Sequence, residues 1–278
     1  LGAVASVASQ SRLRSLITFL DARGEGGALI TRVARSCSSF AVIAFGVIFC
    51  LSKPASDHVP GFDYGPWVDA LVWFAVHLGF GLVLGIIFTL FLLRDFEDEK
   101  ILTVVIGMVI FTSGVAYLLK LSPIVVCFIL GFVLANLSAH AKHVLQMLLS
   151  VERPLYIVIF VFVGASMHFD VAWWAWFAAI PYLGLRSAGR ALGSLVGQGL
   201  SPNVRQLPPL GSALLAPGAL SAAMLLNFSA VFAGQPLVAE LYAALLLAIV
   251  VGEPIAYRLS RRWLIDATDV ALSRETSA

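Results

Sequence analysis

The sequence predicts an all-α polytopic membrane protein. Apolar residues make up 60% of its 278 residues, and only 12% are charged. The mean hydropathy is +0.94, whereas roughly half of the residues of a soluble domain are apolar. Its long apolar tracts lack the alternating pattern of a membrane barrel, so helices are the expected spanning form. The formal net charge of +2 gives no reason to expect nucleic acid as a partner.

Several apolar tracts reach or approach the length of about 20 residues that a helix needs to cross a bilayer. We expect eight spans, at residues 33–52, 67–93, 101–119, 122–139, 154–169, 172–198, 208–228 and 238–259. The tracts 122–139 and 154–169 are short for a simple crossing, and residues 1–8 are too short to span. Because the chain begins at Leu1 within apolar sequence, we expect a fragment whose N-terminal part is absent.

The basic residues between these tracts predict how the chain is oriented. If residues 9–32 form a cytoplasmic loop, strict alternation places fourteen of the 18 Lys and Arg residues inside and only Lys53 and Lys120 outside. This distribution obeys the positive-inside rule. We therefore expect residues 261–278 to form a cytoplasmic tail. The protein would be an integral, multi-pass protein of a bacterial inner membrane.

Two arginines, Arg186 and Arg190, lie near the middle of the span 172–198. On insertion scales each costs about 2.5–3.5 kcal/mol at a helix centre, so the pair costs about 5–7 kcal/mol unless solvated or paired. In a helix that only faces lipid, nothing would compensate this free energy. We therefore interpret this span as the functional centre. We expect Arg186 or Arg190 to contact a carboxylate or a carbonyl of a broken helix.

The span 208–228 is interrupted near its middle by Ala216, Pro217 and Gly218. Proline removes a backbone donor, and glycine permits an unwound backbone. A break at this depth is tolerated where it is buried in protein or lines a watery cavity. Half-helix ends of this kind form ion sites in secondary transporters. A plain proline kink is the alternative.

Glu253 is the only carboxylate well inside an apolar tract. Two arrangements are open for it. It could pair with Arg186 or Arg190, which would offset much of the burial cost, or it could face the cytoplasmic boundary beside Arg258. The sequence contains no enzyme motif and no His/Cys spacing typical of a metal site. We therefore expect no enzyme activity, no cofactor and no metal.

Four stretches of the sequence, taken in order, carry a resemblance to a known family. They read LSPIVVCFILGFVLANLS, VERPLYIVIFVFVGASMHF, LRSAGRALGSLVG and LGSALLAPGALSAAMLL. They closely resemble the C-terminal half of monovalent cation:proton antiporters, the branch that contains sodium/proton and potassium/proton exchangers. The resemblance implies an inverted-repeat fold in which two broken helices cross near the ion site. It also suggests a homodimer, or a partner in a membrane complex.

The resemblance further implies that the spans divide into a moving core, a linker and a dimerisation scaffold. The core would comprise residues 1–8, as the end of the first broken helix, with 33–52 and 172–260, where 208–228 is the second broken helix. The linker would be residues 67–93 and the scaffold 101–169.

The sequence departs from this family in the helix that corresponds to 33–52. There the family carries an aspartate, often an acidic pair, that binds cation and proton in turn, whereas this chain has Ser38 and Ser39 and no acid. Serine oxygens offer ligands but no exchangeable proton near neutral pH. Arg190 stands where the family carries a lysine, and arginine stays protonated.

Three functions follow, in order of preference. The first is a secondary transporter that exchanges Na⁺ or K⁺ for H⁺ through a displaced carboxylate. The second is a transport-inactive antiporter-like subunit with a structural or regulatory role. The third is an anion path, because arginines beside a half-helix N-terminus attract negative charge. The candidate residues of the ion and proton pathway are Arg186, Arg190, Glu253, Ala216, Pro217, Gly218, Ser38 and Ser39.

Overall fold

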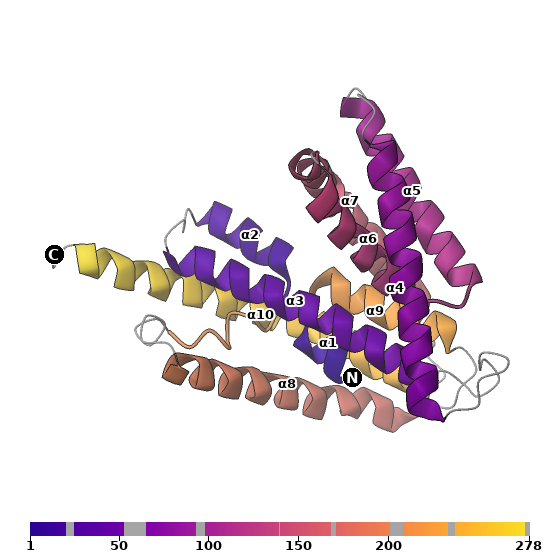
Figure 1. The fold of residues 1–278 in the computed structure, drawn as a ribbon. Coiled ribbons are helices and arrows are strands. Elements are labelled where there is room, and N and C mark those ends of the chain that lie inside the picture. Colours follow the sequence, from indigo (N-terminus) through magenta and orange to yellow (C-terminus); the bar gives the residue numbers. More distant parts are fainter. Residues whose placement is uncertain are drawn as a thin grey trace. The chain divides into compact units, whose positions relative to one another are not determined.

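The computed structural model describes residues 1–20, 25–52, 65–92, 98–138, 140–167, 171–200, 208–232 and 237–275. Within these ranges the chain forms ten helices and no strand, as the sequence predicts (Figure 1). The helices are α1 (Gly2–Ser6), α2 (Gln10–Phe19), α3 (Glu25–Leu51), α4 (Pro66–Phe91), α5 (Asp98–Leu118), α6 (Pro123–Leu137), α7 (Ala141–Ala165), α8 (Trp173–Leu200), α9 (Gly218–Val231) and α10 (Val238–Glu275).

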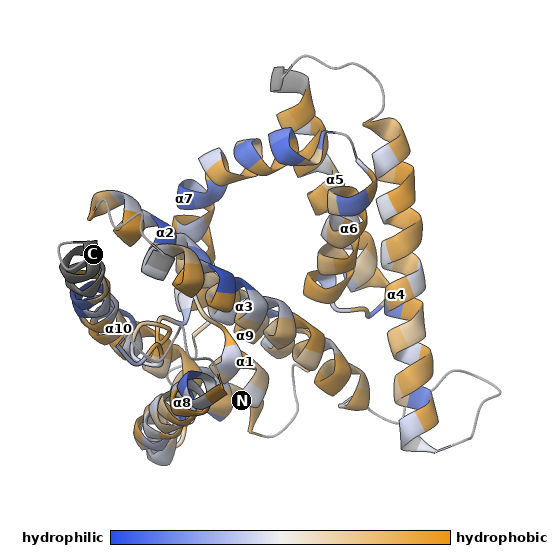
Figure 2. Cartoon of the chain, turned by 60° about the vertical axis from the view of Figure 1, so that its left-hand side comes forward, coloured by the Kyte–Doolittle hydropathy of each residue, from blue (hydrophilic) through white to orange (hydrophobic). Residues whose placement is uncertain are grey.

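Five of the described helices are long and apolar enough to cross a membrane. They contain the segments Gly26–Leu51, Trp67–Phe91, Ile101–Leu118, Ala141–Ala165 and Val238–Ala267. The helices α6 and α9 are equally apolar in character but shorter, and Figure 2 shows hydrophobic residues along most of the described helices. With 28 residues α8 is long enough to span, but Arg186 and Arg190 lower its hydropathy.

The chain divides into two compact units, residues 1–41 with 162–278 and residues 42–161. In the unit 42–161, α6 packs against α4 and α5. Glycines allow α4 to approach α6, since a Cβ at Gly81 or Gly85 would lie 2.8 Å from Ile129 or 2.7 Å from Val133. His77 of α4 binds the start of α6, where Nε2 accepts the backbone N–H of Ser122 at 2.9 Å.

In the unit formed by residues 1–41 and 162–278, α10 packs against α8, α9 and α2, and α1 packs against α9. A hydrophobic cluster joins α2, α3 and α10 to residues 210–214. Its buried members are Ala8, Leu13, Leu16, Ile30, Ala34, Leu210, Ala213, Leu214, Trp263, Leu264 and Ala267. This unit brings the two ends of the chain together around one core.

Two predicted boundaries differ from the helices of the structure. Residues 9–32 are not a loop where they are described, because α2 covers 10–19 and α3 begins at Glu25. The span expected at 154–169 starts too late, since α7 begins at Ala141. The expected cytoplasmic tail is helical as far as Glu275, because α10 continues through it. Hydropathy marks membrane depth, whereas polar residues such as Arg and Gln propagate a helix well in water.

Candidate functional site

Two interrupted segments cross in the unit formed by residues 1–41 and 162–278. The first interruption separates α1 from α2, and its residues Val7 and Ser9 have extended backbones. The second precedes α9, where Ala216 and Pro217 are not helical. The backbone N–H of Ser9 donates to the carbonyl of Ala216 at 3.0 Å. The predicted break at Ala216–Gly218 is confirmed, and a plain kink is not what the chain adopts. Only the half-helix after the break forms, because residues 208–217 make turns and non-helical backbone.

The crossing is close because the second segment carries a glycine where the two backbones meet. Gly218 has a φ of +69°, and a Cβ there would lie 2.7 Å from both Cβ and Oγ of Ser9. A second glycine, Gly211, lies against α8, where a Cβ would stand 2.5 Å from the carbonyl oxygen of Arg190. Both contacts require a residue without a side chain.

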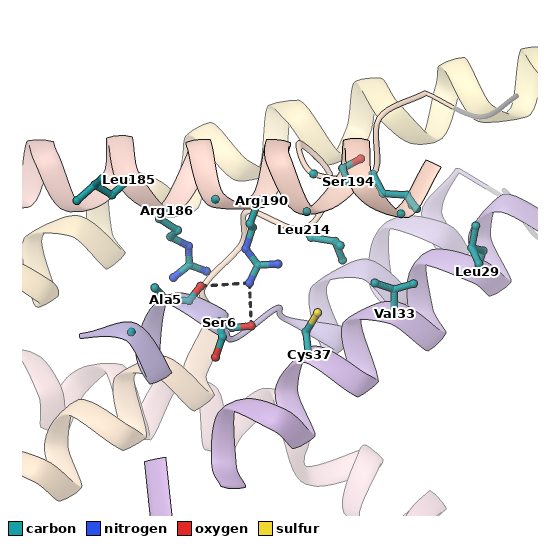
Figure 3. Close-up of a pocket in the computed structure, with 16 residues that line it drawn as sticks. Ala5, Ser6, Leu29, Val33, Cys37, Leu185, Arg186, Arg190, Ser194 and Leu214 are labelled. Atoms are coloured by element: carbon teal, nitrogen blue, oxygen red, sulfur yellow. Dashed lines mark hydrogen bonds between the residues drawn. The ribbon is translucent and has the colours of Figure 1, made fainter. Parts of the chain in front are cut away.

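The two arginines of α8 bind the carboxyl end of α1. Arg186 donates through Nη1 to the Val4 carbonyl at 3.3 Å and through Nη2 to the Val7 carbonyl at 2.8 Å. Arg190 donates through Nη2 to the carbonyls of Ala5 at 3.3 Å and Ser6 at 2.9 Å (Figure 3). The same nitrogen also donates to the Val7 carbonyl at 2.6 Å. The expectation that these arginines contact a broken-helix carbonyl is confirmed.

This arrangement is electrostatically favourable. The last carbonyls of a helix have no partner within the helix, and they form the negative end of its dipole. Cationic side chains near that end both satisfy the oxygens and compensate the partial charge. Arg186 is only 5% exposed, so a buried guanidinium here relies on these carbonyls.

Glu253 of α10 serves the opposite end of a half-helix. Its Oε1 accepts the backbone N–H of Gly218 at 2.7 Å, at the start of α9. Its carboxylate also forms an ion pair with Arg12 of α2. A negative charge at a helix N-terminus is stabilising for the same reason that a cation is at the C-terminus.

Neither of the two arrangements expected for Glu253 includes its actual ion-pair partner, Arg12. Pairing with Arg186 or Arg190 is wrong, because Arg12 occupies that role. Arg258 does line a cavity of about 800 Å³ together with Glu253, Arg12, Arg261 and Arg262. The boundary reading is thus right about the neighbourhood and wrong about the ion pair.

The serines of α3 differ in what they contact. Ser38 is buried, and its Oγ donates to the Ala8 carbonyl at 2.7 Å, in the extended segment of the first interruption. Ser39 is half-buried, and among the described residues it forms no hydrogen bond. The structure therefore brings Ser38 to the crossing and leaves Ser39 beside it.

Arg12 is the site residue that sequence reasoning missed. It lies in the stretch 9–32, which the sequence predicts as a cytoplasmic loop because no apolar tract lies there. The available signal was the break itself. A second half-helix after an interruption at residues 7–9 places Arg12 in its first turn, next to the crossing.

A protein-family model described as "Sodium/hydrogen exchanger, transmembrane" matches residues 17–255 of the chain. The matched range contains both arginines of α8, the break before α9, and Glu253. No curated protein matches the sequence.

Proposed function

Because the chain belongs to the sodium/hydrogen exchanger family, we propose that it exchanges Na⁺ or K⁺ for H⁺ across the membrane. Membership makes it an integral, multi-pass membrane transporter of the antiporter type, and its partners are the bilayer, a cation and protons. The observation that supports the finer assignment is the position of Glu253, the carboxylate at the crossing of the two interrupted segments.

A carboxylate can exchange a cation for a proton because either one neutralises it. Glu253 is 8% exposed, and its charge is balanced by Arg12. A proton on Glu253 would release Arg12 and remove the charge that compensates the start of α9. A cation would have to compete with the Arg12 guanidinium for the same oxygens. Arg12 would then compete with the cation for Glu253, and it would neutralise the carboxylate whenever neither a cation nor a proton is bound.

The remaining pathway residues support this role without titrating. The arginines fix the end of α1, Ser38 fixes the extended segment, and Ala216 and Gly218 supply the backbone at the crossing. We propose that Ser39 lends its oxygen to the cation path beside them. Hard cations prefer oxygen ligands of this kind.

The test is proton flux into proteoliposomes that contain the purified chain. Flux should depend on Na⁺ or K⁺ and should fall at least tenfold in Glu253→Gln, because glutamine keeps an acceptor for the Gly218 N–H and loses the titratable charge. Glu240→Gln, in the first turn of the same helix, is the matched control and should transport as the wild type does. Equal flux in Glu253→Gln and wild type would reject Glu253 as the exchanging group.

One observation favours the second candidate, a transport-inactive antiporter-like subunit. From Gly26 to Leu51 the helix α3 contains no acid, so this helix offers Glu253 no second carboxylate, and both oxygens of Glu253 are already engaged. Wild-type flux equal to that of empty liposomes, together with co-purification of a stoichiometric membrane partner, would establish this function instead. Anion-dependent flux that collapses in Arg190→Ala would identify an anion path.

A further inference from the structure

A cavity of about 700 Å³ lies beside the two arginines of α8. Residues of α1, α3 and α8 and of the segment 210–214 line it, and all of these lining residues belong to the unit formed by residues 1–41 and 162–278 (Figure 3). This volume falls within the range of about 300–1,000 Å³ that is typical of small-molecule sites. The proposed exchange at Glu253 does not use this cavity.

Most of the cavity wall is apolar. The side chains of Leu29, Val33, Leu185, Leu210 and Leu214 line it. On α8 it is bordered by Gly189, Gly193 and Gly197, and a Cβ at any of these glycines would meet no atom within 4 Å. The glycines therefore leave an open slot along the helix, which suits an alkyl chain.

One side of the cavity is cationic and is formed by Arg186 and Arg190. Among the described residues that line it there is no Asp or Glu, and Glu253 is paired with Arg12. Arg190 binds α1 through Nη2, and Figure 3 shows another of its nitrogens turned to the side of Leu214 and Cys37. The Nε atoms of Arg186 and Arg190 and the Oγ of Ser194 are buried without a partner. Buried donors without acceptors are costly.

We propose that this cavity binds a long-chain carboxylate, such as palmitate. Its head would lie at Arg190 and Ser194, and its chain would follow the glycines of α8. A carboxylate offers several lone pairs to guanidinium donors, and charge-assisted bonds of this kind are the strong ones. Its single negative charge offsets one of two neighbouring positive charges, and its chain removes the apolar wall from contact with water.

The experiment uses the whole chain in nanodiscs of zwitterionic lipid, with Cys37 as the reporter. Cys37 lines the cavity, and Cys50→Ser and Cys127→Ser remove the other two thiols of the chain. Saturating palmitate should slow the labelling of Cys37 by a maleimide at least tenfold, whereas methyl palmitate, which has the same chain without the charge, should not. Arg190→Gln should abolish the protection, and Arg262→Gln, outside the cavity, should retain it.

Arg190 also holds α1, so a second pair of variants leaves both arginines in place. Gly193→Phe fills the slot, and Gly184→Phe places the same side chain elsewhere on α8, where a Cβ also meets no atom within 4 Å. Direct binding of tritiated palmitate should fall at least tenfold in Gly193→Phe and stay unchanged in Gly184→Phe. Equal protection by the acid and its methyl ester, or undiminished palmitate binding to Gly193→Phe, would overturn the proposal.

Discussion

At the scale of single residues, buried guanidiniums need acceptors, but they do not need carboxylates. A hydrogen bond from a charged group contributes about 1.5–3 kcal/mol, and three of the bonds from Arg186 and Arg190 are between 2.6 and 2.9 Å long. These three alone offset most of the cost of about 5–7 kcal/mol that the pair incurs in a bilayer. The end of α1 and the two arginines therefore stabilise each other.

Arg186→Ala tests this mutual stabilisation. The substitution removes the guanidinium that donates to the Val4 and Val7 carbonyls and creates a cavity in the unit, so we expect a loss of about 2–4 kcal/mol in unfolding free energy. Tryptophan fluorescence during thermal unfolding in detergent measures the effect as a lower melting temperature. Arg261→Ala on the exposed face of α10 is the control and should unfold as the wild type does. Identical melting of both variants would contradict a stabilising role for Arg186.

The serines of α3 offer a second test, since two neighbours differ in one hydrogen bond. Ser38→Ala removes the bond to the Ala8 carbonyl and should cost about 1 kcal/mol, whereas Ser39→Ala should be neutral. The same thermal unfolding assay compares the two variants. Equal destabilisation by both would mean that the bond of Ser38 contributes nothing specific.

At the scale of elements, the site consists of two half-helix ends with opposite partial charges. The arginines of α8 lie at the negative C-terminal end of α1, and Glu253 lies at the positive N-terminal end of α9. The break before α9 could be predicted, because Pro217 and Gly218 oppose a continuous helix within an apolar tract. The helix α2 could not be recognised by the same criterion, since its sequence is polar and its start follows an interruption. The ion pair of Arg12 with Glu253 joins residues that are 241 positions apart, and no local sequence pattern predicts it.

Gly218→Ala tests whether the crossing needs a glycine. Alanine at a φ of +69° is strained by about 1–2 kcal/mol, and its Cβ would collide with Ser9. We expect the melting temperature to fall by several degrees. Gly184→Ala, which faces open space within α8, should instead be neutral or slightly stabilising, because alanine favours helix.

A rescue experiment separates the two causes. In the double variant Ser9→Gly/Gly218→Ala the collision is removed and only the backbone strain remains, so part of the lost stability should return. A double-mutant cycle with no coupling between these two positions would show that Ser9 and Gly218 do not meet in the folded protein.

At the scale of the whole molecule, the crossing is assembled within the unit of residues 1–41 and 162–278, while residues 42–161 form a unit of their own. Composition and tract length were enough to predict a helical, multi-pass membrane protein, and the family match confirms it. Periodicity could not predict which spans belong together, because apolar faces in a membrane carry no partner-specific pattern. The resemblance to antiporters supplied that grouping.

Orientation is the prediction that belongs to this scale, and it depends on α6. If α3 to α8, the segment 208–231 and α10 each cross once, the number of crossings is even. The start of α3 and the end of α10 then share the side that carries most of the Lys and Arg, which is the cytoplasm. A fluorescent protein fused after Ala278 should therefore fluoresce in cells.

The count of crossings depends on α6, which is short for a span. Its 15 residues extend about 22 Å, whereas the hydrocarbon core is about 30 Å thick. Phosphatase fusions after Lys120 and after Ser138 test it directly, because the enzyme is active only outside the cytoplasm. Activity at Lys120 and none at Ser138 means that α6 crosses, and it supports a cytoplasmic C-terminus. Equal activity at both positions means that α6 re-enters on one side, and every later span would then be inverted with respect to the positive-inside rule.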